Sequence, residues 1–261
     1  MNKISKIINI KKHPINDIKK FAANCKREIQ KNSILVLREF LSSSALKNLQ
    51  KESKKLHQKA FYCSQKHTVL LNKKNNKMGE FDTCNIEVVS DKGCVPHDLI
   101  PKNSFLCQLY NSDKFILFLK KVLNIDNIFP YADTLASINY NYYEQHQQLG
   151  WHFDNASFAI TLMIQSSDSG GNFQYINKGR DIEKNIIDKK LIKSVLTNKY
   201  EGKEILVNPG TLILFYGRNY LHRVTPVKSK KNRILVTLNY NTEKGIKLSE
   251  NARITFFGRL N

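Results

Sequence analysis

Hydrophobic and polar positions in the first half of the chain predict helices around one short strand. Residues 17–31 predict a basic helix, and the apolar run at 33–41 is typical of a buried strand. The serines after that run can cap a second helix. Its apolar side would carry Leu46, Leu49 and Leu56. Residues 112–125 predict a third helix, whereas 64–103 have the composition of irregular, turn-rich loops.

From about residue 128 the pattern changes to short apolar segments separated by Gly, Pro and Asn. These segments occupy 136–145, 151–165, 170–177, 204–219, 222–227, 232–241 and 253–259. Many short strands with such turns favour a sandwich or a closed double-sheet barrel, and no alternation of strands with helices supports a parallel sheet. A polar, partly helical insertion interrupts the strands at about 178–203. We therefore predict a mainly β, cupin-like jelly roll with N-terminal helices packed against it.

Length and composition favour a single domain. The chain has 261 residues, 41% of them hydrophobic, which is enough to bury one sizeable core. We expect residues 1–127 to form a helical and irregular elaboration of that domain, and residues 128–261 to form its jelly-roll catalytic core.

The formal net charge of +20 raises the question of a nucleic-acid partner. Residues 1–80 carry 19 basic and 5 acidic side chains, whereas the remaining 181 residues carry 23 and 17. The excess is therefore peripheral, and the half of the chain that carries the chemistry is nearly balanced. A small-molecule substrate is favoured over nucleic acid as the partner.

Targeting signals and cysteine usage indicate a cytoplasmic protein. The N-terminal segment lacks an apolar core of signal-peptide length, and no apolar stretch approaches the roughly 18 residues that span a membrane. We therefore expect no membrane partner. The five cysteines form no C-x-x-C pair, so reduced, unpaired thiols are expected.

A histidine and an aspartate stand two residues apart where a long apolar run begins. Side chains two apart on a strand share one face, so His152 and Asp154 would converge on one point. His222, which follows a second apolar strand, can complete a set of two histidines and one carboxylate. This set is the facial triad of non-haem Fe(II) oxygenases. Arg233 then begins another strand and offers a permanently charged fork for a carboxylate.

The order H-x-D, H, R resembles that of the Fe(II)- and 2-oxoglutarate-dependent dioxygenases, whose fold is a double-stranded β-helix. The sequence NYYEQHQQLGWHFD matches the Asn-x-Tyr pattern of that family, which implies that Asn141 and Tyr143 bind 2-oxoglutarate together with Arg233. The segments GGNFQY, FYGRNYLHRVTPV and RITFFGR resemble the branch that acts on free amino acids, which includes hydroxylases and radical halogenases. The motif-bearing match covers about residues 130–258.

The resemblance implies an enzyme that uses Fe(II), 2-oxoglutarate and O₂, with His152, Asp154 and His222 as the metal ligands and catalytic centre. Halogenases of this superfamily carry a small residue in place of the metal-binding carboxylate, whereas Asp154 is present here. We therefore expect a hydroxylase of a small polar metabolite, with a free amino acid as the favoured substrate. Such an enzyme couples hydroxylation of a C–H bond to decarboxylation of 2-oxoglutarate to succinate and CO₂.

Polar residues close to these motifs are candidate substrate contacts. They are Asn155, Arg218, Arg223, Thr237 and Asn239. The last two follow Arg233 at positions where a strand can direct polar groups into the pocket.

Two other functions remain open at this point. A nucleic-acid demethylase of the alkylation-repair type would use the same triad and the positive charge. The pattern of that branch, however, has a much shorter gap between the second histidine and the arginine. It also has a second arginine on the same strand, where RILVTLNYN has Thr237 and Asn239. A non-enzymatic jelly-roll binding module is disfavoured because the whole set from His152 to Arg233 is intact. The sequence leaves the oligomeric state and the exact substrate open.

Overall fold

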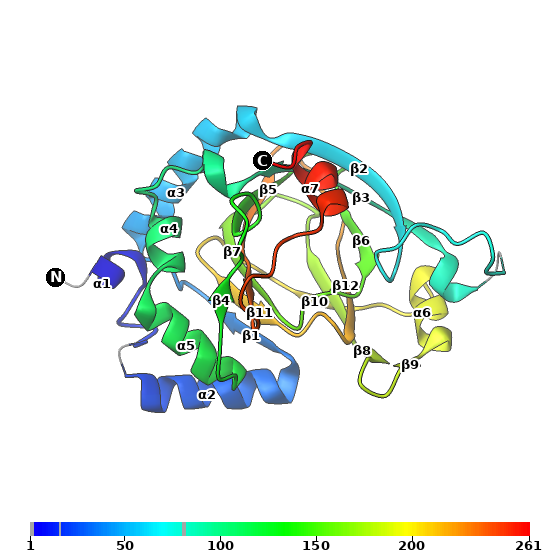
Figure 1. Cartoon of the computed structure of the whole chain (residues 1–261), viewed down its shortest axis with the longest axis horizontal. Coiled ribbons are helices and arrows are strands. Elements are labelled where there is room, and N and C mark those ends of the chain that lie inside the picture. Colours follow the sequence, from blue (N-terminus) through cyan, green and yellow to red (C-terminus); the bar gives the residue numbers. More distant parts are fainter. Residues whose placement is uncertain (1–2, 16, 80–81) are drawn as a thin grey trace.

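Two antiparallel sheets face each other at the centre of the molecule (Figure 1). The computed structural model describes residues 3–15, 17–79 and 82–261. The larger sheet has the spatial order β1 (Ile34–Leu37), β11 (Leu212–Phe215), β7 (Ala159–Gln165), β13 (Arg233–Leu238), β5 (Ile138–Tyr143), β3 (Glu87–Val95) and β2 (Phe61–Thr68). The smaller sheet has the order β10 (Lys203–Ile205), β8 (Phe173–Asp181), β12 (Tyr220–Val224) and β6 (Leu149–His152), and β9 (Ile186–Ile187) pairs with β8. The short strands β4 (Phe129–Pro130) and β14 (Tyr240–Asn241) form a separate pair.

Aromatic and apolar side chains from both sheets meet between them. Phe173 of β8 lies edge-on to Phe215 of β11, with ring centroids 5.3 Å apart, and Met163 of β7 belongs to the same buried cluster. Because side chains alternate along a strand, the neighbours of these residues point outward from the two sheets. The predicted mainly β jelly roll is therefore confirmed, and each sheet also has an outer face to cover.

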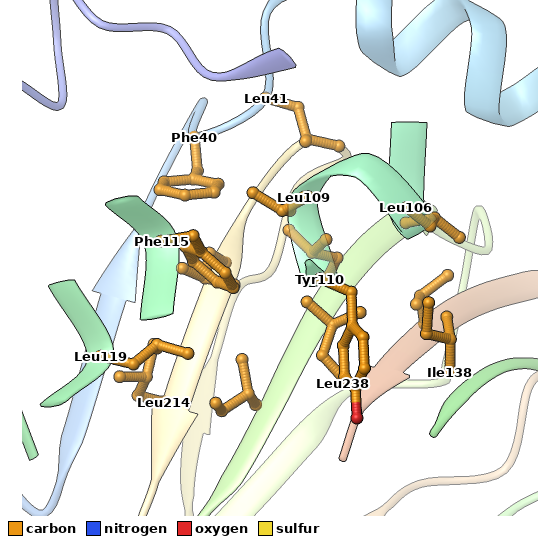
Figure 2. Packing of buried hydrophobic residues seen from close by; sticks show 14 of the residues in the cluster. Phe40, Leu41, Leu106, Leu109, Tyr110, Phe115, Leu119, Ile138, Leu214 and Leu238 are labelled. Atoms are coloured by element: carbon orange, nitrogen blue, oxygen red, sulfur yellow. The ribbon is translucent and has the colours of Figure 1, made fainter. Parts of the chain in front are cut away.

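Helices from the first half of the chain cover the outer face of the larger sheet (Figure 1). They are α1 (Lys3–Ile7), α2 (Ile18–Asn32), α3 (Ser43–Leu56), α4 (Phe105–Tyr110) and α5 (Asp113–Leu123). Ser42 begins α3, because its Oγ accepts a hydrogen bond from the N–H of Ala45. Figure 2 shows Phe115 of α5 beside Phe40, with Leu214 of β11 in the same cluster. This packing confirms the prediction of N-terminal helices against the jelly roll.

The structure corrects the expectation of irregular loops at 64–103. That segment contains the end of β2 and all of β3, which pair in register from Phe61 opposite Cys94 to Thr68 opposite Glu87. Strand β2 forms an edge of the larger sheet, and its outward face is polar and exposed. It therefore lacks the apolar run by which a buried strand is recognised. Short 3₁₀ helices at His57–Lys59, Thr83–Asn85 and His97–Leu99 flank these strands.

A helix replaces the strand predicted at 253–259. Helix α7 (Glu250–Phe257) begins at Ser249, whose Oγ accepts from the N–H of Ala252, and ends at Gly258 with φ 69°. These two caps favour a helix although the run ITFF has β-type composition. Phe257 is buried with Cys94, and α7 lies across β2 and β3 (Figure 1).

Two further segments refine the predicted pattern. The stretch 151–165 is divided into β6 and β7, so Asp154 lies in the connection between them. The segment 178–203 contains the end of β8, all of β9 and helix α6 (Lys189–Leu196). Lys189 Nζ lies 2.7 Å from Asp82 Oδ2 and so joins α6 to the segment before β3. Within the described ranges, no helix is long and apolar enough to cross a membrane.

Candidate metal centre

The two histidines of the predicted triad are cross-strand neighbours in the smaller sheet. His152 of β6 pairs with His222 of β12, and their ring centroids lie 4.1 Å apart. Asp154 follows β6, and its Oδ1 lies 3.5 Å from the Nε2 atom of each histidine. These three side chains are the group among the described residues whose donor atoms can hold one metal ion. The two imidazoles are each 5% exposed, so the site is shielded from solvent.

Backbone carbonyls fix the orientation of both imidazoles. Nδ1–H of His152 donates to the carbonyl of Gly150, and Nδ1–H of His222 donates to that of Tyr220, each at 2.8 Å. A carbonyl can only accept, so the proton is on Nδ1 and the lone pair of Nε2 faces Asp154. This is the arrangement that orients histidine ligands in metal sites.

Arg233 is a buried cation on the inner face of the larger sheet. It pairs with Tyr143 across β13 and β5, and its guanidinium lies 5.2 Å from the centroid of the Tyr143 ring. Arg233 is 3% exposed, and neither its Nε nor its Nη1 has a hydrogen-bond partner among the described residues. Burial lowers the pKa of this guanidinium. A buried cation with unpaired donors fits an anion such as a carboxylate.

The sequence matches a family model over most of its length. The model is described as Halogenase D, and it matches residues 18–254. The chain belongs to the Halogenase D family. No curated protein matches the sequence.

Solved structures share the fold of this Halogenase D family member at low sequence identity. An oxidoreductase of the 2OG-Fe(II) oxygenase family from Burkholderia pseudomallei is 12% identical, with 88% of this chain and 94% of that chain covered and a TM-score of 0.55. The carbocyclase SnoK from nogalamycin biosynthesis is 10% identical, with 95% of each chain covered and a TM-score of 0.58. A prolyl-4-hydroxylase from Pseudomonas putida is 11% identical, with 83% and 96% covered and a TM-score of 0.51.

The family match and the shared fold confirm the predicted membership of the Fe(II)- and 2-oxoglutarate-dependent dioxygenase superfamily, related to the halogenases. The residues present fit the Fe(II), 2-oxoglutarate and O₂ that this superfamily uses. The buried donor set of two imidazoles and one carboxylate suits a divalent iron, and the unpaired Arg233 suits the distal carboxylate of 2-oxoglutarate.

Two arginines of the Halogenase D fold hold the connection that carries Asp154. Arg180 donates from Nη2 to the carbonyl of Asp154 at 3.0 Å, and its guanidinium lies 4.7 Å from the centroid of the Phe153 ring. Arg218, predicted as a substrate contact, donates from Nη2 to the carbonyl of Asn155 at 2.6 Å. Sequence reasoning missed Arg180 because it lies in the polar segment 178–203, where nothing signalled contact with the metal site.

The structure places the other predicted substrate contacts in different surroundings. Asn155 is exposed at the connection after Asp154, and Thr237 shares the inner face with Arg233. Asn239 donates from Nδ2 to the carbonyl of Ala136, so it holds a backbone turn. Arg223 lies 4.7 Å from the Trp151 ring, on the face of β12 opposite His222, and the structure does not bring it to the metal centre.

Lys92 is a second cation inside the barrel that the sequence did not reveal. The register of β3 with β5 places it beside Tyr143, and its Nζ donates to Asn141 Oδ1 at 2.7 Å. The same Nζ lies 5.0 Å from the centroid of the Phe256 ring in α7. The sequence did not predict Lys92 as a barrel residue, because the segment around it has the composition of loops. Its alternation with the outward Gly93 was the signal that could have found it.

A cavity of about 440 Å³ lies along β2 and ends near the metal centre; we refer to it as the β2 cavity. Its lining includes Cys63, Gln65, His67, Lys73, Ile254 and Thr255. The His67 ring lies 6.3 Å from that of His152, and its Nε2 is 2.6 Å from Ser90 Oγ. The His67 side chain therefore lies between the β2 cavity and His152 of the predicted triad.

Burial and mutual contact set the protonation of the triad. Burial lowers the pKa of His152, so this imidazole is neutral and available as a ligand at neutral pH. Burial opposes the charge of Asp154, but the facing imidazoles of His222 and His152 outweigh it and hold the pKa of Asp154 well below its ordinary value. At neutral pH the site therefore offers one carboxylate and a neutral His152.

Removing either imidazole should abolish metal binding and leave the fold intact. His152→Ala and His222→Ala each delete one of three ligands, so we expect the affinity for Fe(II), or for Co(II) as a spectroscopic substitute, to fall more than about 100-fold. Titration of the visible Co(II) absorption measures this loss, with far-UV circular dichroism as the check on folding. His146→Asn is the matched control, because His146 is exposed and its φ of 72° suits asparagine. Wild-type metal affinity in either alanine variant would reject the assignment.

Acid should destabilise the metal-free protein. Folding lowers the pKa of His152, so below its ordinary value of 6.5 the unfolded chain binds a proton more readily and the free energy of unfolding falls. The lowered pKa of Asp154 acts in the same direction at more acidic pH. Urea unfolding at about pH 7.5 and about pH 5.5 measures the difference. Burial also lowers the pKa values of His13 and His97, so these two histidines add to the pH dependence of unfolding in every variant. His152→Gln should make the pH dependence shallower, and an unchanged dependence would contradict the role of burial.

Proposed function

We propose that this protein is an Fe(II)- and 2-oxoglutarate-dependent hydroxylase of a small polar metabolite, with a free amino acid as the favoured substrate. One observation carries the choice of hydroxylation: the carboxylate of Asp154 lies 3.5 Å from Nε2 of both triad histidines. The third protein position of the site is thus taken by a side chain.

The family name does not by itself decide the reaction. A halide would need the position that the Asp154 carboxylate takes, and a second anion beside a buried carboxylate is disfavoured by charge repulsion at low dielectric. The backbone of Asp154 is also held on both sides. Its carbonyl accepts a hydrogen bond from Arg180, and its N–H donates to the carbonyl of Gly217 at 3.1 Å. We therefore assign hydroxylation, in which chloride has no role.

The chain's own residues divide the remaining work. His152, Asp154 and His222 would hold Fe(II), which with O₂ and 2-oxoglutarate supplies the oxidising power to hydroxylate a C–H bond while 2-oxoglutarate is converted to succinate and CO₂. Arg233 would bind the distal carboxylate of 2-oxoglutarate, and Tyr143 flanks it. Asn141, also expected to contact 2-oxoglutarate, has its Oδ1 bound to Lys92.

Charge inside the barrel favours a substrate that carries a carboxylate. With Arg233 assigned to 2-oxoglutarate, Lys92 remains as an interior ammonium that can bind a second carboxylate, such as that of an amino acid. The β2 cavity, at about 440 Å³, lies within the range of small-molecule sites. None of the described residues that line it is acidic, and Lys66 and Lys73 are among them. Neutral and acidic amino acids should therefore be preferred over basic ones.

The alternative is a nucleic-acid demethylase of the alkylation-repair type, and the net charge of +20 is the observation that favours it. Such an enzyme takes a flipped base between aromatic or apolar walls. Phe61 and Tyr62, which line the β2 cavity, are partly exposed aromatic residues. A small metabolite still ranks first, because Lys92 lies inside the barrel whereas most of the positive charge is peripheral.

Succinate release separates these functions. The purified protein with Fe(II), 2-oxoglutarate and O₂ is screened against the common amino acids and against methylated oligonucleotides, and products are identified by mass. We expect a mass gain of one oxygen on a neutral or acidic amino acid, and no halogenated product in chloride. Lys92→Met should raise the KM for that substrate, whereas Lys47→Met, on the exposed surface of α3, should not. Turnover of oligonucleotides alone would reject the amino-acid assignment.

Loss of the Arg233 guanidinium should impair use of 2-oxoglutarate specifically. Arg233→Ala removes a charge-assisted, bidentate partner, so the 2-oxoglutarate concentration needed for half-maximal turnover should rise on the order of 10- to 100-fold. Metal affinity, followed by Co(II) absorption, should change little. Arg223→Ala is the control, because Arg223 lies on the opposite face of β12. An unchanged 2-oxoglutarate requirement in Arg233→Ala would remove Arg233 from this role.

A further inference from the structure

Gly217 lies against the carboxylate of Asp154. A Cβ atom built on Gly217 would lie 1.9 Å from Asp154 Oδ2, 2.6 Å from its Cγ and 2.9 Å from Cε1 of His222. Contacts below 3.0 Å are essentially never observed for a Cβ atom. Even alanine at position 217 is therefore incompatible with the observed position of the Asp154 carboxylate.

Space, and not backbone conformation, explains this glycine. Gly217 is absent from the residues of positive φ in the described chain, so alanine can adopt its backbone conformation. Its carbonyl accepts the N–H of Asp154 at 3.1 Å, which holds the two residues together. The Oδ2 atom that faces Gly217 is buried and has no hydrogen-bond partner among the described residues. Steric room is thus what Gly217 supplies to that oxygen.

We propose that Gly217 is a positioning residue that determines the third ligand of the metal site. It leaves the space that the Asp154 carboxylate occupies, and with Asp154 shortened to glycine the same space would admit a small anion such as chloride. The inference rests on the proposed metal centre. Arg180 binds the backbone carbonyl of residue 154, so its cation would remain beside that space after the substitution.

The proposal predicts that the effect of alanine at 217 depends on the residue at 154. The two shortest contacts of the added Cβ are with the Asp154 carboxylate, and they vanish in Asp154→Gly. The remaining contact, at 2.9 Å with the edge of the His222 ring, lies just below the 3.0 Å limit and needs a far smaller shift than the 1.9 Å contact with Asp154 Oδ2. Residues that share one space in this way show non-additive effects.

The test compares four proteins: wild type, Gly217→Ala, Asp154→Gly and the double variant. Gly217→Ala should lower Co(II) affinity about tenfold or more, whereas in the Asp154→Gly background it should change that affinity less than about threefold. Asp154→Gly should bind azide or chloride, seen as a change in Co(II) absorption, and the double variant should bind the anion more weakly. Gly79→Ala is the control, since nothing lies within 4 Å of its added Cβ.

Metal-free unfolding tests the steric pair independently of the proposed function. Gly217→Ala should lower the midpoint of urea unfolding in the presence of Asp154 and leave it nearly unchanged in the Asp154→Gly background. If the single variant does not fold, the double variant must fold. Equal losses in both backgrounds, a double variant that stays unfolded, or absence of anion binding by Asp154→Gly would each overturn the proposal. Failure of Co(II) to respond to His152→Ala would instead reject the metal centre.

Discussion

The pairing of β6 with β12 is the constraint on which the site depends. It sets His152 directly opposite His222 on the inner face of the smaller sheet, and the register then shifts before Val224. A slip of either strand by one residue would turn its imidazole to the outer face, where Trp151 and Leu221 pack under α6. The buried apolar cluster on that outer face therefore fixes the geometry of the polar centre on the inner one.

Charged groups without protein partners lie at the two places where the proposed function puts a metal ion and 2-oxoglutarate. Asp154 Oδ2 and two nitrogens of Arg233 are buried and lack hydrogen-bond partners in the described part of the chain. Leaving such groups unpaired costs free energy, and folded proteins rarely do so. The apolar core on the opposite face of the larger sheet, where α5 packs on β11, helps to offset this cost. Binding of a cation at the triad and of an anion at Arg233 would each stabilise the folded state further.

Sequence reasoning found the residues whose chemistry is carried by type and spacing. His152, Asp154, His222 and Arg233 lie next to apolar strands, and short strands with turn residues predicted the two-sheet fold. It missed features that depend on tertiary pairing. Strands β2 and β3 are stabilised by each other and by β5 although their composition is polar, so Lys92 went unseen. Arg223 directly follows His222 on β12, so strand alternation places it on the opposite face, and its prediction as a substrate contact overlooked that rule.

The polar outer face of β2 also affects how this molecule behaves at high concentration. A free strand edge exposes backbone donors and acceptors that another chain can extend, and charged side chains on such an edge discourage that pairing. Lys66 lies on the outward face of β2, whereas Cys63, Gln65 and His67 share the inner face. One strand thus lines a cavity and resists intermolecular sheet formation at the same time. Replacing Lys66 with an apolar residue would change one residue of the cavity lining and would also turn a charged edge into a template for aggregation.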